Sequence, residues 1–259
     1  MLLAHLSDPH LRADALAARP AAALHTALGR VLALDPRPDC VVITGDLVEY
    51  GHHAAYEQLR DLVGQFPLPV HLVVGNHDEP ATVREVFAST PFLGGTQDTR
   101  YVVDYDHFSL IVLDSKRSGS PGGRLGEQQL TWLDELLTTR DSVPVFVALH
   151  HPPVAVGIPF LDGIRLADGA ALAEVVSRHH NVARVLAGHA HRAIHVPFAA
   201  TVVAVAPSTF RQTSLTLRAD RQIGYLDEPP GFLLHVLTED GTATHTVPVY
   251  DGGALIGAF

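Results

Sequence analysis

The sequence predicts an α/β fold, because short and almost uninterrupted apolar segments alternate with amphipathic segments along its 259 residues. Apolar runs without polar alternation are typical of strands buried on both faces, as in sheets that helices cover. A hydrophobic fraction of 47% and a charged fraction of 18% are enough for a large core and exclude a disordered or fibrous chain.

The first part of the chain is predicted to contain three strands and two helices. Three apolar runs, residues 2–6, 40–44 and 70–74, each end in a turn signal that contains aspartate or asparagine. Residues 20–34 have the apolar spacing of a helix and begin with proline, which suits the first turn. Residues 54–63 carry their apolar side chains on one side and form the second predicted helix.

The middle of the chain continues the alternation. Residues 101–114 contain two apolar runs around Asp106-His107, which is a hairpin pattern. Residues 126–137 predict an amphipathic helix. Residues 143–149 and 182–187 predict strands, and a histidine cluster follows each of them.

The last part of the chain combines an irregular segment with a second hairpin. Residues 207–231 are irregular and are expected to form a mobile loop or cap. Residues 232–249 predict a hairpin that turns at Asp240-Gly241 and either extends a sheet or meets a partner chain. No repeat or composition break forces a domain boundary. We therefore expect residues 1–206 to form the core and residues 207–259, the cap loop and C-terminal hairpin, to complete the same domain.

Composition and charge exclude several classes of protein. A single cysteine, Cys40, provides neither an intrachain disulfide nor a thiolate metal cluster, and its place in an apolar strand is typical of a small buried residue. The net charge of −10 gives no overall attraction to nucleic acid or to anionic membranes. Residues 193–207, the longest nearly uncharged stretch, are too few for a membrane helix, and no signal peptide is visible. We expect a cytoplasmic protein.

Polar clusters follow five of the predicted strands. In a sheet built from strand–helix–strand units, the carboxyl ends of the strands lie along one edge, where ligand crevices form. We therefore expect these five turns to converge, although they are far apart in the chain. They are Asp8-Pro9-His10, Gly45-Asp46, Gly75-Asn76-His77-Asp78, His150-His151-Pro152-Pro153 and Gly188-His189-Ala190-His191.

The clusters offer carboxylate, imidazole and amide groups, a set that suits Zn, Mn, Fe, Co or similar ions. In the Asp-x-His and His-x-His spacings, alternate residues of an extended chain point the same way. Each cluster alone is weak evidence, because Gly-Asp and Asp-x-His also occur in ordinary turns and helix caps. Seven ligands exceed one tetrahedral site but suit two ions that share a carboxylate. The candidates are Asp8, His10, Asp46, Asn76, His150, His189 and His191.

The ordered clusters resemble the D-x-H, G-D, G-N-H-D/E, H and G-H-x-H pattern of the calcineurin-like metallophosphoesterases. The His-His-Pro-Pro form and the opening Met-Leu-Leu-Ala-His-Leu-Ser-Asp are similar to class III cyclic nucleotide phosphodiesterases and the related glycerophosphodiesterases. The resemblance implies a four-layer αββα sandwich of two mixed sheets flanked by helices. It also implies two metal sites with a bridging Asp46. The first site, often iron, comprises Asp8, His10, Asp46 and His191, and Asn76, His150 and His189 complete the second.

The resemblance further implies hydrolysis of small phosphodiesters, either cyclic nucleotides such as cAMP or glycerophosphodiesters. Two ions about 3.5 to 4 Å apart lower the pKa of a shared water, and the hydroxide that bridges them is the expected nucleophile. His77 is assigned to the phosphoryl oxygen or the leaving alkoxide, as donor or general acid. Asp78 is expected to orient His77 by accepting its other ring proton.

Several other side chains have both an ordinary and a functional interpretation. His5 lies inside the first strand and is expected to be a core imidazole with satisfied hydrogen bonds. His151 either orients substrate or bonds a backbone carbonyl. His195 is a candidate for the rim of the site, and Arg211 is a candidate contact for phosphate or leaving group. For Arg211 an exposed salt bridge is the more common role of such a residue.

Other functions remain open at this point. A phosphomonoesterase or phosphoprotein phosphatase uses the same metals. A nuclease requires basic patches that the sequence does not show. A metal-free interaction scaffold predicts lost ligands, whereas all seven are present. Because similar proteins are often dimers or larger, we expect a homodimer or higher homo-oligomer. The net negative charge leads us to expect that it binds no nucleic-acid polymer and no membrane.

Overall fold

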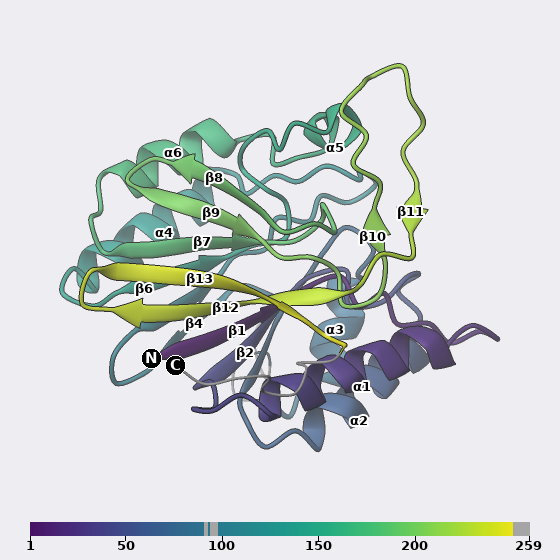
Figure 1. Cartoon of the computed structure of the whole chain (residues 1–259). Helices are drawn as coiled ribbons and strands as arrows, with labels where there is room; N and C mark the ends of the chain where they lie inside the picture. Colours follow the sequence, from purple (N-terminus) through teal and green to yellow (C-terminus); the bar gives the residue numbers. More distant parts are fainter. Residues whose placement is uncertain (91–92, 94–97, 251–259) are drawn as a thin grey trace, which may run out of the picture.

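Two mixed β-sheets pack face to face, and helices cover both outer faces, in the computed structural model of the chain (Figure 1). The structure describes residues 1–90, 93 and 98–250. The arrangement confirms the four-layer αββα sandwich. None of the helices in the described part of the chain is both long enough and apolar enough to cross a bilayer.

The first sheet has five strands in the order β13-β12-β1-β2-β3. Strands β1, β2 and β3 are parallel to one another, while β12 runs antiparallel to β1 and pairs with β13 in a hairpin. Helices α1, α2 and α3 cover its outer face (Figure 1). The bounds are β1 Leu2–Leu6, β2 Cys40–Thr44, β3 Val70–Val73, β12 Gly231–Thr238, β13 Gly241–Pro248, α1 Ala18–Leu32, α2 His53–Gly64 and α3 Pro80–Val86.

The second sheet has six strands in the order β4-β5-β6-β7-β9-β8, with antiparallel pairs at both edges. Helices α4 and α6 cover it, while α5 and the two-stranded arm β10-β11 lie together at one end (Figure 1). The bounds are β4 Tyr101–Asp104, β5 Ser109–Val112, β6 Val145–Ala148, β7 Val182–Ala187, β8 Ile194–Phe198, β9 Thr201–Val205, β10 Gln212–Thr213, β11 Tyr225–Leu226, α4 Glu127–Thr139, α5 Pro159–Gly163 and α6 Gly169–Ser177.

The continuous apolar runs form strands because both of their faces are buried. Every residue of β2 and of β6 is buried, so no position of either strand needed a polar side chain. Leu6 of the first sheet packs in one cluster with Phe146 and Leu186 of the second. Cys40 lies in this core, where burial raises the pKa of its thiol to about 12. The thiol is a small buried group and no nucleophile.

Parallel strand order brings the turns after β1, β2, β6 and β7 to one edge of the sandwich. The Asp8 N–H donates to the Gly45 carbonyl at 3.2 Å, and the Gly188 N–H donates to the His150 carbonyl at 2.9 Å. The His189 N–H donates to Asp8 Oδ2 at 3.1 Å and thereby joins the two sheets. The predicted convergence of these turns is confirmed.

The structure also differs from the sequence-based expectations. The first helix begins at Ala18, two residues before the predicted start, and helices α3, α5 and α6 and strand β9 were not predicted. Residues 207–231 are not wholly irregular, because they contain β10 and β11. The predicted C-terminal hairpin extends the first sheet through β12. Residues 251–259 of the expected C-terminal segment lie outside the described residues.

Candidate metal centre

All seven candidate ligands lie in turns at the carboxyl ends of parallel strands. Asp8 and His10 follow β1, Asp46 follows β2 and Asn76 follows β3, while the three remaining histidines follow β6 and β7. Six of the seven side chains are buried, and Asn76 is half-buried. The structure brings them into two adjoining groups.

The first group joins Asp8, His10, Asp46 and His191. Nε2 of His10 lies 3.1 Å from Nε2 of His191 and 3.6 Å from Oδ2 of Asp46. Nε2 of His191 lies 3.3 Å from Oδ1 of Asp8. Four candidate ligand atoms from three turns therefore face one small volume.

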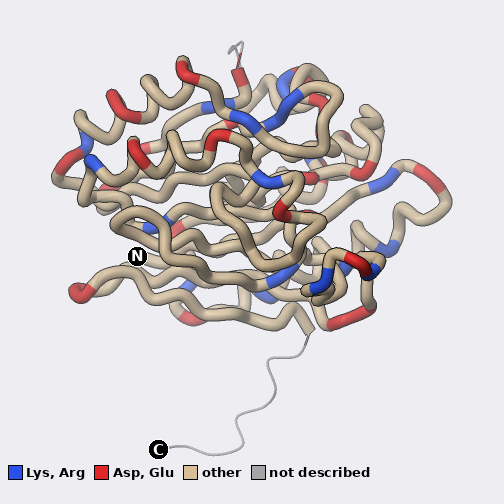
Figure 2. The backbone as a smooth tube through the Cα atoms, turned by 90° about the horizontal axis from the view of Figure 1, so that it is seen from above, with Lys and Arg blue, Asp and Glu red and all other residues tan. Residues whose placement is uncertain are grey.

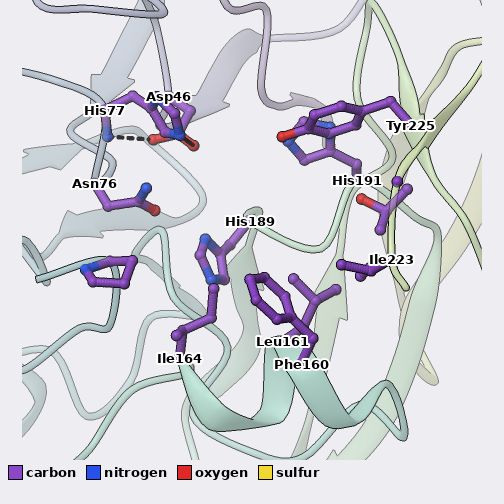
Figure 3. Close-up of a pocket in the computed structure, with 13 residues that line it drawn as sticks. Asp46, Asn76, His77, Phe160, Leu161, Ile164, His189, His191, Ile223 and Tyr225 are labelled. Atoms are coloured by element: carbon purple, nitrogen blue, oxygen red, sulfur yellow. Dashed lines mark hydrogen bonds and ion pairs between the residues drawn. The ribbon is translucent and has the colours of Figure 1, made fainter. Parts of the chain in front are cut away.

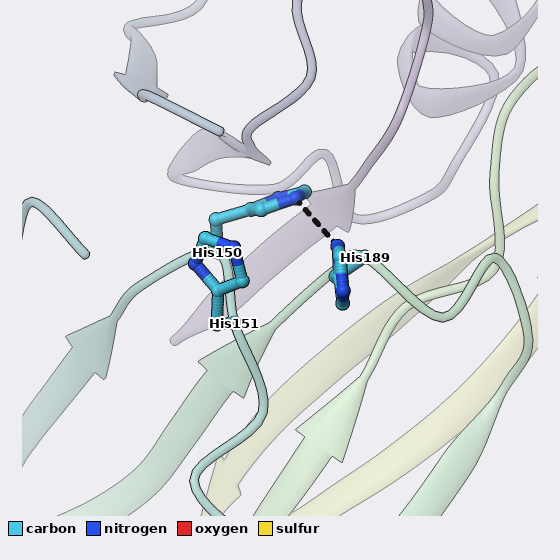
Figure 4. Close-up of side chains that lie close together, drawn as sticks. All are labelled: His150, His151 and His189. Atoms are coloured by element: carbon cyan, nitrogen blue, oxygen red, sulfur yellow. Dashed lines mark hydrogen bonds between the residues drawn. The ribbon is translucent and has the colours of Figure 1, made fainter. Parts of the chain in front are cut away.

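The second group is centred on His150 Nε2. This atom lies 3.1 Å from Asn76 Oδ1, 3.2 Å from His189 Nδ1 and 3.4 Å from Asp46 Oδ1. Figure 4 shows the rings of His150 and His189 meeting through these nitrogens, with His151 beside His150. Asp46 thus directs one carboxylate oxygen toward each group, as a bridging ligand requires.

The protonation of the rings tests whether a cation fits. Nδ1 of His150 lies 2.7 Å from the Thr44 carbonyl, and Nδ1 of His191 lies 2.8 Å from the Arg211 carbonyl. A carbonyl only accepts hydrogen bonds, so each Nδ1 carries the ring proton. In the neutral ring, Nε2 then presents a lone pair to the centre of its group.

The carboxylate of Asp8 adds another acceptor atom beside these lone pairs. Oδ1 of Asp8 is buried and has no hydrogen-bond partner in the described part of the chain. Its nearest facing atoms are Nε2 of His191 and Nε2 of His10. A buried cluster of acceptors that face one another is costly unless a cation lies among them. The residues present therefore fit metal ions.

The carboxylates and imidazoles of the two groups shift one another's pKa values. Against the effect of burial, Asp46 raises the pKa of His150 to about 9, and Asp8 raises the pKa of His191. Burial opposes ionisation of Asp46, but the neighbouring His150 and His10 hold the pKa of its carboxyl well below the usual range. Burial also opposes ionisation of Asp8, and His191 lowers the pKa of that carboxyl. Burial and the neighbouring His150 lower the pKa of His189 to about 3. Two carboxylates and a neutral His189 are the forms that ligate metals.

The turns that carry the ligands have unusual backbone conformations. In the described part of the chain, six non-glycine residues have positive φ, and five of them are candidate ligands, with φ between 48° and 67°. Such conformations are costly and persist where the surrounding structure enforces them, which is common at functional sites. They are Asp8, His10, Asp46, His189 and His191.

Two glycines of the motifs are required by close packing. A Cβ at Gly45 would collide with the ring of His150. A Cβ at Gly188 would collide with Ser7 Oγ and with the Thr44 carbonyl. Both glycines let one ligand-bearing turn approach another, which explains why these two polar clusters begin with glycine.

His77 lies at the edge of the centre, and the expectation about Asp78 is wrong. Nε2 of His77 is 3.9 Å from Asp46 Oδ2, whereas its Nδ1 lies 2.8 Å from the Glu49 carbonyl. The Glu49 carbonyl, and not Asp78, therefore accepts the other ring proton. Asp78 is turned away from this ring because its carboxylate is occupied elsewhere.

The carboxylate of Asp78 holds the turns together. It accepts hydrogen bonds from the N–H groups of Leu47, Val48 and Gly75 and from the Tyr56 hydroxyl, at 2.7 to 3.2 Å. Burial and the charge of Asp46 raise its pKa to about 7 against these donors. Asp78 therefore links the turn after β2 to the turn after β3, which places Asp46 beside Asn76.

The remaining candidate side chains, His151, His195 and His5, either bond other protein groups or lie away from the pocket. Nε2 of His151 lies 3.1 Å from the Pro121 carbonyl and its Nδ1 lies 2.8 Å from Ser115 Oγ, so its ring bonds protein groups. His195 is exposed on edge strand β8 and does not line the pocket described below. His5 is fully buried, and both of its ring nitrogens have hydrogen-bond partners.

Sequence reasoning missed Glu49 and misjudged Arg211. Glu49 Oε2 lies 3.0 Å from His10 Nδ1, and Arg211 Nη2 lies 2.8 Å from the same oxygen. This salt bridge is largely buried beneath the arm and is not the exposed pair that was expected. Glu49 follows Asp46 in the same turn, but its single carboxylate has no motif of its own. Only the folded arm shows its partner.

A cavity of about 310 Å³ opens above the two groups. One wall carries candidate ligands and His77, while the opposite wall is apolar and comes from α5 and the arm (Figure 3). The site is therefore a pocket with a polar floor and an apolar side. It is lined by Asp46, Asn76, His77, Pro121, Phe160, Leu161, Ile164, His189, His191, Thr213, Ile223, Gly224 and Tyr225.

Known proteins are similar to this chain in sequence and in fold. Residues 1–193 match the family described as calcineurin-like phosphoesterase. A probable glycerophosphodiester phosphodiesterase from Arcobacter nitrofigilis is 30% identical over 252 residues, which cover 95% of this chain and 92% of that protein. A cAMP/cGMP dual specificity phosphodiesterase from Mycobacterium tuberculosis is 33% identical over an alignment that covers 100% of this chain and 82% of that protein.

Among solved structures, a dimetal phosphatase from Danio rerio superimposes with a TM-score of 0.70 at 19% identity, covering 96% of this chain and 99% of that one. This likeness concerns the fold alone. The sequence matches carry the assignment further, because they span at least 95% of this chain and at least 82% of each relative. The chain belongs to the calcineurin-like phosphoesterases, in the branch that contains glycerophosphodiester and cyclic nucleotide phosphodiesterases.

Proposed function

We propose that this protein is a metal-dependent phosphodiesterase and that the seven candidate ligands hold two metal ions. Asp8, His10, Asp46 and His191 bind the first ion, and Asn76, His150 and His189 complete a second site that shares Asp46. The observation that carries the proposal is the inward-facing set of ligand atoms: Nδ1 of His150 and of His191 each bond a carbonyl, and Oδ1 of Asp8 has no hydrogen-bond partner among the described residues. When bound, the ions supply Lewis acidity that stabilises charge on phosphoryl oxygens and activates water.

The protein's own groups orient these ligands. Backbone carbonyls fix the tautomers of His150 and His191, so that both rings keep Nε2 free for a cation. Oε2 of Glu49 lies 3.0 Å from His10 Nδ1 and adds negative charge behind that ring. The buried position of these groups excludes water from the floor of the pocket and strengthens their electrostatic interactions.

His77 is proposed to assist the departing group. Its Nδ1 donates to a carbonyl, so the neutral ring offers only a lone pair at Nε2. The ring donates a proton at Nε2 only when both nitrogens are protonated. As a general acid it therefore acts in its cationic form, with Nε2 directed toward the side of the pocket that holds Asp46.

The proposed substrates are small phosphodiesters, either cyclic nucleotides such as cAMP or glycerophosphodiesters. A cavity of about 310 Å³ suits one such molecule and no long polymer. In the view of Figure 2, Lys and Arg of the described residues alternate with Asp and Glu and form no continuous basic track. The names of the two curated relatives agree with a diester substrate.

Finer features are also proposals. The bound ions are Fe, Mn, Zn or Co, since imidazole, carboxylate and amide ligands accept all four. We further propose a cytoplasmic enzyme that assembles as a homodimer or larger homo-oligomer. Residues 1–206 are proposed to form the phosphoesterase core, which residues 207–259 complete within one domain.

A kinetic panel tests the function. The manganese-loaded enzyme is assayed with cAMP, glycerophosphodiesters, bis-p-nitrophenyl phosphate and p-nitrophenyl phosphate, and kcat/KM is compared. We expect diesters to be hydrolysed faster than the monoester, and a chelated sample to be inactive. Rapid hydrolysis of the monoester with no hydrolysis of any diester would instead show a phosphomonoesterase. Fewer than one metal ion per chain after reconstitution would indicate an interaction scaffold.

A further inference from the structure

Tyr225 projects from the arm into the pocket on the side of the metal ligands. Its ring centroid lies 5.4 Å from that of His191, at an interplanar angle of 32°. Figure 3 shows the hydroxyl end of the ring pointing across the cavity toward the side that holds Asp46 and His77. Among the described residues that line the pocket, Tyr225 alone carries a phenol.

A chain of contacts fixes the Tyr225 ring. The Arg211 guanidinium carbon lies 3.9 Å from the ring centroid, within the range of a cation–π contact. Arg211 Nη2 is held by both carboxylate oxygens of Glu49, at 2.8 and 3.1 Å. Oε2 of Glu49 in turn lies 3.0 Å from His10 Nδ1. The arm residue is thus joined through two side chains to a candidate metal ligand.

The Tyr225 hydroxyl adds a neutral hydrogen-bond donor to a pocket whose other side carries candidate metal ligands. Nδ1 of His77 is engaged by the Glu49 carbonyl, so the ring donates from Nε2 only in its cationic form. Asp46 and the ligand nitrogens are acceptors as well. Opposite them the wall from α5 is apolar at Phe160 and Leu161. The Tyr225 hydroxyl points toward the polar side of this cavity, where a phosphoryl oxygen of a bound diester would lie.

We propose that Tyr225 is a catalytic residue whose hydroxyl donates a hydrogen bond to a phosphoryl oxygen of the diester, and that Arg211 is a positioning residue that fixes the tyrosine ring. The inference rests on the proposed phosphodiesterase function. Negative charge on the phosphoryl oxygens increases in the transition state, so this hydrogen bond is stronger there than in the bound substrate. Loss of the hydroxyl should therefore lower kcat more than it raises KM.

The test compares Tyr225→Phe with Tyr50→Phe in the manganese-loaded enzyme, using bis-p-nitrophenyl phosphate. Tyr50 is a matched control, because it is also exposed and also lies under an arginine, with Arg12 5.1 Å from its ring centroid, but it does not line the pocket. We expect Tyr225→Phe to lower kcat by about 10- to 100-fold with unchanged manganese content. Tyr50→Phe should stay within about twofold of the wild type.

Two further measurements separate direct contact from structural damage. Calorimetric titration of the manganese-loaded protein with inorganic phosphate should show binding about three- to tenfold weaker in Tyr225→Phe. In a double-mutant cycle, Arg211→Met should lower kcat, and Tyr225→Phe should cost much less in that background than in the wild type. Fully additive effects would overturn the positioning role of Arg211.

The outcomes distinguish this inference from the proposed function. A wild type that hydrolyses the diester, with a Tyr225→Phe variant within twofold of it in kcat, would overturn the inference and leave the function intact. Loss of manganese from Tyr225→Phe would overturn it too, because the residue would then act on the metal centre. A wild type without diesterase activity would overturn the function itself.

Discussion

Two groups of buried histidines lie in this molecule, one in the core between the sheets and one at their common edge. In the core, His5 Nδ1 meets His235 Nε2 at 3.2 Å. The outer nitrogens of this pair meet Thr44 Oγ1 and Thr244 Oγ1, each at 2.9 Å. Every ring nitrogen of the core pair therefore has a partner that can donate as well as accept.

The edge group differs in where its second nitrogens point. His150 and His191 bond carbonyls with Nδ1 and turn Nε2 toward other acceptors. His5 and His235 bond each other and hydroxyls, which adjust their protons to suit either ring. A buried histidine such as His150 or His191 is thus a candidate ligand, because Nδ1 donates to a carbonyl and Nε2 faces the carboxylates of its group. Burial alone does not make the distinction.

Among the variants that test this comparison, Asp46→Asn is expected to have the largest effect. The variant keeps the shape of the side chain but removes the negative charge that faces both groups. We expect kcat/KM for the diester to fall by about a thousandfold or more, because the bridging carboxylate is lost from both metal sites. Metal content by mass spectrometry should fall with it. An Asp46→Asn enzyme with two ions and full activity would contradict the assignment of the edge group.

The second test concerns His77, which belongs to neither group since it is half-buried at the pocket wall. We expect His77→Ala to keep its metal and to lower kcat by about a hundredfold for a diester with an alkyl leaving group. The loss should be smaller for p-nitrophenol, which leaves without protonation. Equal losses for both leaving groups would exclude a general acid at this position.

The sequence predicted much of the fold and of the edge group, for identifiable reasons. The strands were predictable because runs such as residues 40–43 are apolar throughout, and the candidate ligands because they follow such runs closely. Helix α5 was not predicted, since its five residues carry no periodic signal. Glu49 was missed and Asp78 was misassigned because their partners, Arg211 and three backbone N–H groups, come from other segments. Local sequence cannot encode such partners.

The core pair is tested by His235→Leu with His235→Gln as its control. Leucine fills the space but leaves His5 Nδ1 buried without a partner, which costs about 1 to 3 kcal/mol. Glutamine can restore part of that hydrogen bond and should recover part of the loss. The free energy of unfolding is measured by urea denaturation of the metal-free protein. Loss of the metals from His235→Leu, as expected for Asp46→Asn, would contradict the distinction between the core pair and the edge group.

The same test asks whether the core pair is connected to the edge group. Thr44 Oγ1 donates to Ser7 Oγ at 2.8 Å, and Ser7 Oγ donates to Asp8 Oδ2 at 2.5 Å, so a hydrogen-bonded chain runs from His5 to a candidate ligand. We expect kcat/KM of His235→Leu to stay within about threefold of the wild type, because four hydrogen bonds separate His235 from Asp8. A much larger loss would show that the core pair orients the metal centre.

The smallest effect is the pH dependence of stability that the core pair contributes. Burial lowers the pKa of His5 to about 3, although Asp8 opposes this shift, and burial together with His5 lowers the pKa of His235 well below 6.5. Arg184 and His195 of the second sheet act in the same direction on His235. Both rings are therefore neutral in the folded state, whereas the unfolded chain protonates them near pH 6.5.

The sign follows from this difference in bound protons. Below pH 6.5 the unfolded chain binds protons that the folded protein does not, so the free energy of unfolding falls as the pH decreases toward 3. Each ring contributes a slope of at most about 1.4 kcal/mol per pH unit. A His5→Gln, His235→Gln variant of the metal-free protein should therefore lose stability less steeply between pH 6.5 and 5 than the wild type. Parallel curves for the two proteins would mean that the core histidines bind protons alike in the folded and unfolded states, and the contrast with the edge group would then rest on hydrogen-bond geometry alone.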